Sequence, residues 1–288
     1  MAASKYGAIP LANANLAALA QIKGQYALHN TVPDRLPFYD RSVSSFHGII
    51  CHIGVGAFHR SHEEVFTHEL LVDQMEGVCD SSERWGIVGI GLRGTATRDI
   101  LSEQDYLYSV VGQDESEEPT VTVVGSLVDM VLTGDDPEGN AAIERLANSK
   151  TRIVSLTLTE NGYHVNMATR ELDVTEPSVA HDLKQPHEAP KSAVGLIAKA
   201  LALRRLRGLR PFTILSCDNL PGNGDLTRTM VIGFLKATGD KELVAWTDRH
   251  CAFPNSMVTC FQQRKKSTFE LLLCPQFGPI FSTTTTTT

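Results

Sequence analysis

The stretch Gly48–Val72, GIICHIGVGAFHRSHEEVFTHELLV, decides the fold of this chain. It opens on the nearly continuous apolar run Ile49–Ile53, which is typical of a parallel strand covered on both faces. Gly54 and Gly56 follow at once and allow a tight turn whose main chain can approach a bulky anion. A helix is expected directly afterwards, with its first N–H groups directed at that anion. The pattern predicts a strand, turn and helix of the kind that binds dinucleotides.

The glycine motif is incomplete, because His59 stands where the third glycine of GxGxxG belongs. Taken alone, the stretch fits a glycine-rich turn without a ligand as well as it fits a dinucleotide site. Its continuation, Gly54-x-Gly56-x-Phe58-His59-Arg60-x-His62, closely resembles the opening signature of the polyol-specific long-chain dehydrogenases, the mannitol 2-dehydrogenase family. This resemblance implies a set of cofactor-binding residues: Ile53, Gly54, Val55, Gly56, Ala57, Phe58, Arg60 and His62. Arg60 and His62 are expected to face the phosphates or to hold the turn.

Composition limits the partners. The net charge of −7, with dispersed basic residues, leaves no electrostatic footprint for nucleic acid or an anionic membrane. No window approaches the roughly 18 apolar residues of a membrane span, and the N-terminus has no signal-peptide pattern. The six cysteines form no CxxC motif, so free thiols are expected. Together these features favour a cytoplasmic protein.

A second strand is predicted at Trp85–Ile90, about thirty-five residues after the first, which is the length of one right-handed βαβ crossover. The crossover helix is expected to start near Ser61, to end near Met75 and to bury Val65, Phe66, Leu70 and Val72. The expected fold class is therefore α/β, a doubly wound Rossmann-type sheet with flanking helices.

The rest of the chain supplies further elements of such a fold. Residues 164–190 look irregular, and the later part of 129–147 looks helical. The other predicted strands are Ser102–Val111, Pro119–Val124, Thr151–Leu158 and Phe212–Ser216. The other predicted helices are Ser192–Arg207, Asp225–Ala237 and Lys241–His250.

Three segments are expected along the chain. Residues 1–46 form an N-terminal helix and an extended arm, VPDRLPFYDRS, which packs or tethers. Residues 47–258 form the dinucleotide-binding domain. Residues 259–288 resemble nothing in the family and end in six threonines, so we expect a disordered tail and a chain truncated after Val258.

The choice of cofactor is open at this stage. An NAD site normally carries an acid near the end of the second strand, where it accepts hydrogen bonds from the adenosine ribose. This chain has Gly91-Leu92-Arg93-Gly94-Thr95 there. Arg93 could face the 2′-phosphate of NADP, or it could be a solvated loop residue. The resemblance implies NAD, with NADP as the alternative.

Two strand ends carry the remaining candidate site residues. Thr159 and Glu160 follow the strand Thr151–Leu158 in a segment similar to the family's TxTExGY, and strand ends face the ligand in open α/β sheets. Asn219 lies in Cys217-Asp218-Asn219-Leu220-Pro221, similar to the family's SCDNL. A neutral carboxamide can donate to an oxygen that gains negative charge as hydride leaves, so Asn219 is the predicted oxyanion donor. A turn-forming asparagine is the plainer alternative.

A metal site is not expected. His52, His59 and His62 are close in sequence, but the first lies in the strand and the other two are three residues apart at a helix start.

The resemblance implies a reversible, metal-independent oxidation of D-mannitol to D-fructose with NAD(P), in which a lysine is the base. That lysine belongs to a K…N…H pattern absent here, and Lys265 and Lys266 lie in the unmatched tail. We therefore expect a chain that binds nucleotide and is inactive alone. The resemblance also implies a monomer, because members of the family are often monomeric. The alternatives are a non-catalytic nucleotide-binding isoform and a related hexuronate or arabinitol dehydrogenase.

Overall fold

A five-stranded parallel sheet forms the centre of the molecule. The computed structural model describes residues 36–112, 120–158, 162–166 and 169–257. The strands lie in the order β5-β2-β1-β6-β9, and every neighbouring pair is parallel. Their bounds are Gly48–Ile53 (β1), Trp85–Gly91 (β2), Leu127–Leu132 (β5), Thr151–Leu156 (β6) and Thr213–Ser216 (β9). This order confirms the doubly wound α/β expectation, because the chain adds strands first on one side of β1 and then on the other.

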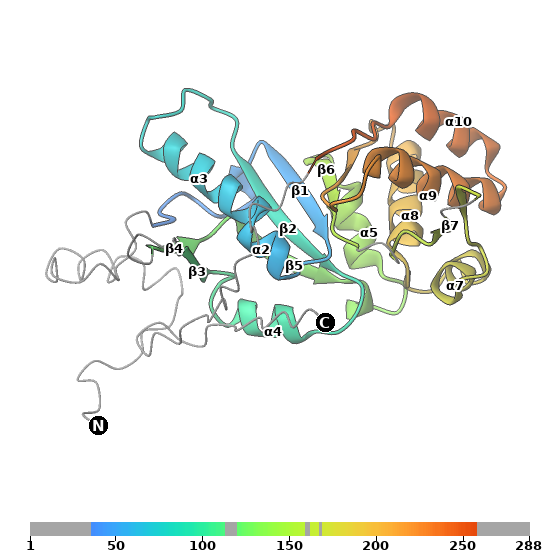
Figure 1. Ribbon diagram of the computed structural model, residues 1–288, viewed down its shortest axis with the longest axis horizontal. Coiled ribbons are helices and arrows are strands. Elements are labelled where there is room, and N and C mark those ends of the chain that lie inside the picture. Colours follow the sequence, from blue (N-terminus) through green and yellow to red (C-terminus); the bar gives the residue numbers. More distant parts are fainter. Residues whose placement is uncertain (1–35, 113–119, 159–161, 167–168, 258–288) are drawn as a thin grey trace, which may run out of the picture.

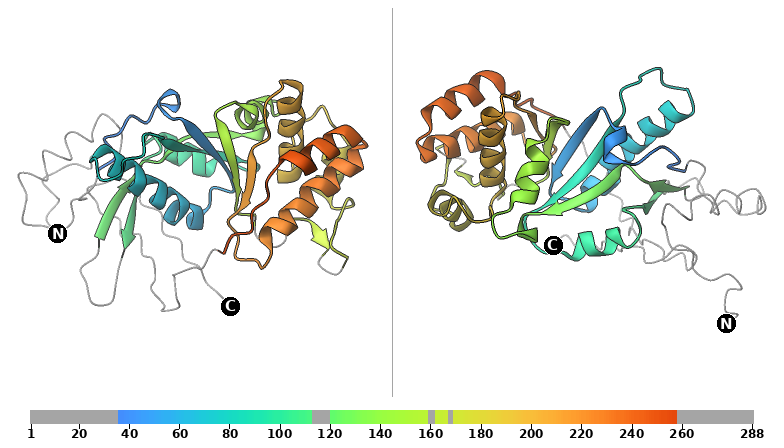
Figure 2. Two further views of the ribbon diagram at one scale, coloured as in Figure 1. Left: turned by 90° about the horizontal axis from the view of Figure 1, so that it is seen from above. Right: turned by 180° about the vertical axis from the view of Figure 1, so that it is seen from behind.

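Helices cover both faces of the sheet (Figure 1). Helices α8, α9 and α10 gather at one end of the molecule, whereas α3 and the β3–β4 hairpin lie at the other (Figure 2). The α-helices are Ala57–Ser61 (α2), Glu63–Met75 (α3), Ala96–Ser102 (α4), Asn140–Ala147 (α5), Pro177–Lys184 (α7), Ala193–Leu206 (α8), Asn223–Thr238 (α9) and Lys241–His250 (α10). The remaining elements are the 3₁₀ turns Val43–Ser45 (η1) and Thr133–Asp135 (η2) and the short strands Tyr108–Gly112 (β3), Thr120–Val124 (β4), Val165–Asn166 (β7) and Glu171–Leu172 (β8).

The two faces of β1 have different chemistry. Because side chains alternate along a strand, Cys51 and His52 point to opposite faces. Cys51 is fully buried with its Sγ 3.9 Å from the Arg145 carbonyl oxygen of α5. His52 is also fully buried, and its ring stacks on that of His59 in α2. One face of the central strand therefore meets an apolar helix layer, and the other meets a polar one.

The predicted start and end of the crossover helix are confirmed by α3, but its predicted buried side is wrong. The chain forms two helices with a break at His62, whose φ and ψ of −124° and −89° are not helical. Phe66 is 61% exposed and Leu70 is 42% exposed, so neither is on the buried side. The buried side of α3 consists of Glu64, His68, Leu71 and Val72. The apolar pattern misled because two polar side chains of this helix find partners inside the protein.

Other differences follow from pairing that no local pattern shows. The segment Ser102–Val111 begins as the end of α4 and turns before β3, and β3 pairs only with β4 in a separate antiparallel sheet. Strand β5 was not predicted. Residues 164–190 include β7, β8 and α7. The remaining predicted strands and helices are confirmed to within a few residues at each end.

The two ends of the chain lie largely outside the described residues, as do the N-terminal helix and the tail 259–288. The described end of the predicted arm packs into the core, where Leu36, Tyr39 and Phe46 are buried. Arg41 fastens it to the sheet by donating to the carbonyl oxygens of Gly125 and Leu127, each 2.8 Å away.

A buried arginine ties α8 to the start of β6. Arg204 is 3% exposed and its Nη1 donates to the carbonyl oxygens of Asn148 (2.6 Å) and Thr151 (3.2 Å). Its Nε donates to the Arg210 carbonyl oxygen at 2.7 Å, and its guanidinium lies over the Phe212 ring. The guanidinium thus satisfies carbonyl groups of the α5–β6 connection, the first residue of β6 and the α8–β9 connection, at the edge of the sheet opposite the glycine turn.

Arg204→Leu should lower the free energy of unfolding by about 3 kcal/mol, because buried carbonyl groups lose their donors. The matched control is Arg205→Leu on the same helix, where the side chain is more exposed and pairs with Glu242. That change should cost less than about 1 kcal/mol. Urea unfolding followed by circular dichroism measures both, and equal losses would contradict the role given to Arg204.

Candidate active site

The glycine turn after β1 has one glycine that its backbone requires and one that it does not. Gly54 has φ +104°, and a Cβ there would lie 2.3 Å from the Thr157 carbonyl oxygen. A Cβ on Gly56 would meet only the Gly54 carbonyl oxygen at 3.7 Å, an ordinary contact. The Gly54 position is therefore dictated by the fold of the turn, whereas the Gly56 position leaves open space above it.

A cavity of about 810 Å³ opens over this turn at the carboxyl ends of β1, β2 and β6. This is the point where the strand order reverses, and open α/β sheets bind ligands there. The cavity lining includes five of the predicted site residues: Ile53, Gly54, Val55, Gly56 and Arg93. Arg93 is exposed, and the described part of the chain shows no ion pair for it. The structure thus brings the glycine turn and Arg93 into one cavity.

Other predicted residues lie elsewhere. Ala57, Phe58, Arg60 and His62 are not among the cavity-lining residues. The Phe58 ring stacks on His62 with centroids 5.0 Å apart, and Arg60 donates to the Val55 carbonyl oxygen at 3.3 Å. Arg60 thus contacts the turn, and its predicted contact with the phosphates stays a prediction. Thr159 and Glu160 lie outside the described residues.

Asn219 is exposed in the loop after β9, at the same edge of the sheet as the glycine turn but outside the cavity lining. Its neighbours shape that loop. Asp218 accepts from the Leu158 N–H at 2.9 Å and from the Tyr163 hydroxyl at 2.7 Å. Asn223 donates to the Asp218 carbonyl oxygen at 3.0 Å. These contacts hold the loop and leave the Asn219 side chain at the surface.

The far side of the cavity carries charged residues that the sequence analysis missed. Arg98 pairs with Asp135, and His164 lies with its Nδ1 3.7 Å from Glu176. Lys191 is exposed just before the cap of α8. All of these except Asp135 line the cavity. No motif marks them, because Arg98 lies in α4 and the other three come from three separate connections.

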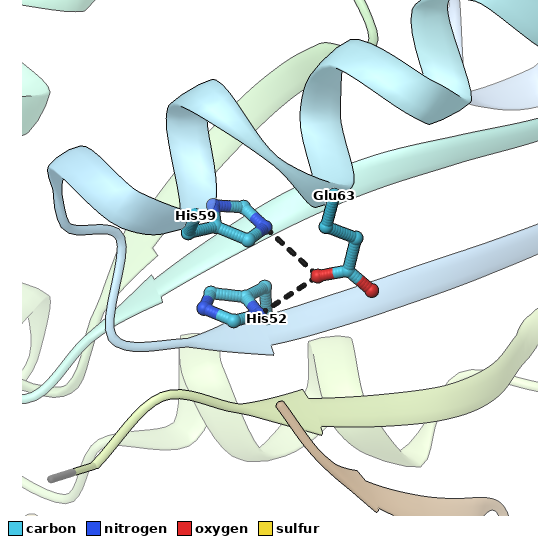
Figure 3. Close-up of side chains that lie close together, drawn as sticks. All are labelled: His52, His59 and Glu63. Atoms are coloured by element: carbon cyan, nitrogen blue, oxygen red, sulfur yellow. Dashed lines mark ion pairs between the residues drawn. The ribbon is translucent and has the colours of Figure 1, made fainter. Parts of the chain in front are cut away.

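A buried polar cluster lies beneath the glycine turn (Figure 3). The rings of His52 and His59 stack with centroids 3.4 Å apart and an 11° interplanar angle. One carboxylate oxygen of Glu63, Oε2, lies 3.0 Å from His52 Nδ1 and 3.0 Å from His59 Nε2. His59 Nδ1 is 2.7 Å from Glu64 Oε1, and the Tyr108 hydroxyl lies 2.5 Å from the other oxygen of Glu64.

The two histidines have opposite charge preferences. Burial and the neighbouring His59 lower the pKa of His52 to about 4. Burial alone would also lower the pKa of His59, but Glu64 and Glu63 more than compensate and raise it to about 9. Contacts with the two histidines outweigh burial and lower the pKa of Glu63. At neutral pH the cluster therefore holds a neutral His52 stacked on a cationic His59.

The donor set of His52, His59 and Glu63 suits proton sharing better than a metal ion. The three ligand atoms lie within 4.8 Å of one another. The imidazole rings are parallel, however, so their lone pairs point along separate planes 3.4 Å apart and do not converge as tetrahedral zinc ligands would. His62, the third histidine of the sequence pattern, instead contacts Phe58 and Phe66.

The free energy of unfolding should be greatest near pH 6.5. The raised pKa of His59 gives a contribution that is complete below its unfolded value and is lost as pH rises toward about 9. The lowered pKa of His52 gives a contribution that is complete above its unfolded value and is lost as pH falls toward about 4.

The free energy of unfolding should fall by about 2 kcal/mol toward acid pH, the acid limb, and by about 2 kcal/mol toward alkaline pH, the alkaline limb. Urea unfolding from pH 4.5 to 9.5 measures both, and His52→Gln should lose the acid limb while keeping the alkaline one. A free energy of unfolding that does not change over this range would contradict the assigned charges.

Comparison with known proteins places this arrangement in a family. The profile of the mannitol dehydrogenase Rossmann domain matches residues 48–266. Mannitol dehydrogenase DSF1 of Saccharomyces cerevisiae is 41% identical over 234 residues, which cover 81% of this chain and 44% of that protein. Mannitol 2-dehydrogenase of Pyricularia oryzae is 40% identical over 227 residues, which cover 78% of this chain and 43% of that protein. The chain thus spans less than half the length of these relatives.

Solved structures agree. The ternary complex of Pseudomonas fluorescens mannitol 2-dehydrogenase with NAD and D-mannitol superposes with a TM-score of 0.73 and 36% identity, over 86% of this chain and 46% of that one. D-sorbitol dehydrogenase in its substrate-free form gives a TM-score of 0.68 and 36% identity over 77% of this chain and 44% of that one. Since the family profile covers more than half of the chain, from the first residue of β1 onward, the chain belongs to the mannitol dehydrogenase family of oxidoreductases through its Rossmann domain.

Proposed function

We propose that this chain binds NAD or NADP with the pyrophosphate over Gly54-Val55-Gly56, as the cofactor half of a polyol dehydrogenase. The observation that carries the proposal is the cavity over this turn at the reversal point of the strand order. A homologous mannitol 2-dehydrogenase of the same fold has been solved with NAD and D-mannitol. The reaction we propose is the reversible oxidation of D-mannitol to D-fructose, with hydride passing to the nicotinamide.

Several residues have proposed roles in that reaction. Ala57 and Phe58 continue the turn past the pyrophosphate. Thr159 and Glu160, which lie outside the described residues, have a proposed role in contacting the cofactor. Asn219 donates from its carboxamide to the oxygen that gains negative charge during hydride transfer. Its exposed position at the carboxyl edge of the sheet supports this role, because a polyol bound above the nicotinamide would reach the same edge.

The described residues suggest no general base. Lys191 is the one lysine in the lining of the described cavity, and it is exposed. A lysine that acts as a base is normally desolvated in a closed site. We therefore propose that this chain, studied alone, binds nucleotide without oxidising polyol.

We also propose that the chain is a monomer of the cytoplasm. In the described part of the chain no helix is long and apolar enough to cross a membrane, and the described cysteines are free.

Titration with NADH and NADPH, followed by nicotinamide fluorescence and then by addition of D-fructose, tests the proposal. Gly56→Ala should weaken nucleotide binding at least about tenfold, because the methyl group occupies the open space above the turn. Gly134→Ala is the matched control, since a Cβ there would meet nothing within 4 Å and the residue does not line the cavity. Oxidation of NADH by fructose would refute the inactivity of the chain, and a lack of nucleotide binding would refute the whole proposal.

Arg93 should favour NADPH. It is an exposed cation at the end of β2, where an acidic residue would normally hold the ribose of NAD. Arg93→Ser should weaken NADPH binding about tenfold through the loss of one charge-assisted contact, with little change for NADH. Arg152→Ser, an exposed site near the start of β6, controls for net charge. Equal affinities of the wild type for NADH and NADPH would make Arg93 a solvated loop residue.

A further inference from the structure

Three donor groups converge on the carbonyl oxygen of Gly54. The Gly56 N–H donates to it at 2.7 Å and the Thr157 hydroxyl at 2.7 Å. His52 Nε2 lies 3.2 Å from the same oxygen and 2.9 Å from Thr157 Oγ1. This carbonyl belongs to the residue with φ +104°, so its direction and the conformation of the glycine turn are set together.

The hydrogen-bond directions assign the proton on His52. A carbonyl oxygen only accepts, so the Thr157 hydroxyl donates its one hydrogen to the Gly54 carbonyl oxygen. Thr157 Oγ1 is then free to accept from His52 Nε2–H. A deprotonated Nε2 would place its lone pair against two oxygen atoms. The neutral tautomer with hydrogen on Nε2 is therefore the one that satisfies all three groups.

The other ring nitrogen faces two oxygen atoms. His52 Nδ1 lies 2.8 Å from Ser155 Oγ, whose one hydrogen can go to Nδ1 or to Glu63 Oε2, 3.0 Å from that hydroxyl. Glu63 Oε2 lies 3.0 Å from both His52 Nδ1 and His59 Nε2. The other titratable groups around this cluster are Glu64 of α3, Tyr108 of β3 and Cys217 beyond β9, and burial keeps the last two uncharged by raising their pKa. Burial keeps His52 neutral, so with its one hydrogen on Nε2 the ring accepts at Nδ1 from Ser155, and the cationic His59 balances the charge of Glu63.

We propose that His52 is a positioning residue for the dinucleotide: its Nε2–H, through the Thr157 hydroxyl, fixes the Gly54 carbonyl and with it the turn that lies under the pyrophosphate. This inference rests on the proposed nucleotide binding. His52 lies beneath the turn with no exposed surface, so it acts through the main chain and touches no ligand.

Paired variants separate positioning from folding. Thr157→Val and His52→Leu remove the donors and should weaken NADH and NADPH binding about tenfold, whereas Thr157→Ser and His52→Gln keep a donor and should stay within about twofold of the wild type. His68→Leu is the matched control, because His68 is equally buried in α3 but contacts Tyr39. It should lower stability and leave nucleotide affinity unchanged.

A second readout does not depend on nucleotide. Long-range ¹⁵N–¹H spectra of the histidine side chains at pH 7 should show His52 neutral with hydrogen on Nε2. A cationic His52, or hydrogen on Nδ1, would overturn the positioning role. So would unchanged nucleotide affinity in both Thr157→Val and His52→Leu. Failure of the folded wild type to bind either nucleotide would instead overturn the proposed function, whatever tautomer is found.

Discussion

The carbonyl group of Gly54 is the constraint on which this site depends. At φ +104° the residue must be glycine, and the neighbouring Thr157 main chain leaves no room for a Cβ. The same close approach joins the ends of β1 and β6, between which the strand order reverses. The cavity over the turn exists because these two strand ends are held together while the connections that follow them diverge.

The layer beneath the turn is unusual for a sheet–helix interface, since α2 and α3 present His59, Glu64 and His68 where apolar side chains are commonly found. Buried charges of this kind are costly to desolvate and offset that cost only when each has partners. Here Glu63 and Glu64 flank His59, and Tyr108 and Ser155 complete the contacts. We interpret the cluster as a device that specifies geometry at the turn more than one that adds stability, because an apolar interface would bury the same area at lower cost.

The cavity also has a consistent electrostatic character. Arg93, Arg98 and Lys191 line it, while Glu176 is its one carboxylate among the described residues. Glu176 is itself occupied as the cap of α7, where it accepts from the Ser178 and Val179 N–H groups. An excess of cations around a glycine turn suits a polyanionic ligand such as a dinucleotide, and it agrees with the family to which the chain belongs.

The sequence by itself determined the fold class, the central strand, the glycine turn and the family, because these depend on short-range patterns: an apolar run, two glycines and a motif within 25 residues. It also located Arg93 in the cavity, since the end of the second strand follows from the length of one crossover. The polar interior of α3 was missed for a physical reason. From the sequence, the polar Glu64 and His68 are expected at the surface of the helix. Only the structure shows that Tyr108 contacts Glu64 and that Tyr39 contacts His68. The role of His52 likewise depends on Thr157, which is 105 residues away along the chain. Only the tertiary structure decided these features, because hydrogen bonds between distant strands and helices leave no periodic signal in the sequence.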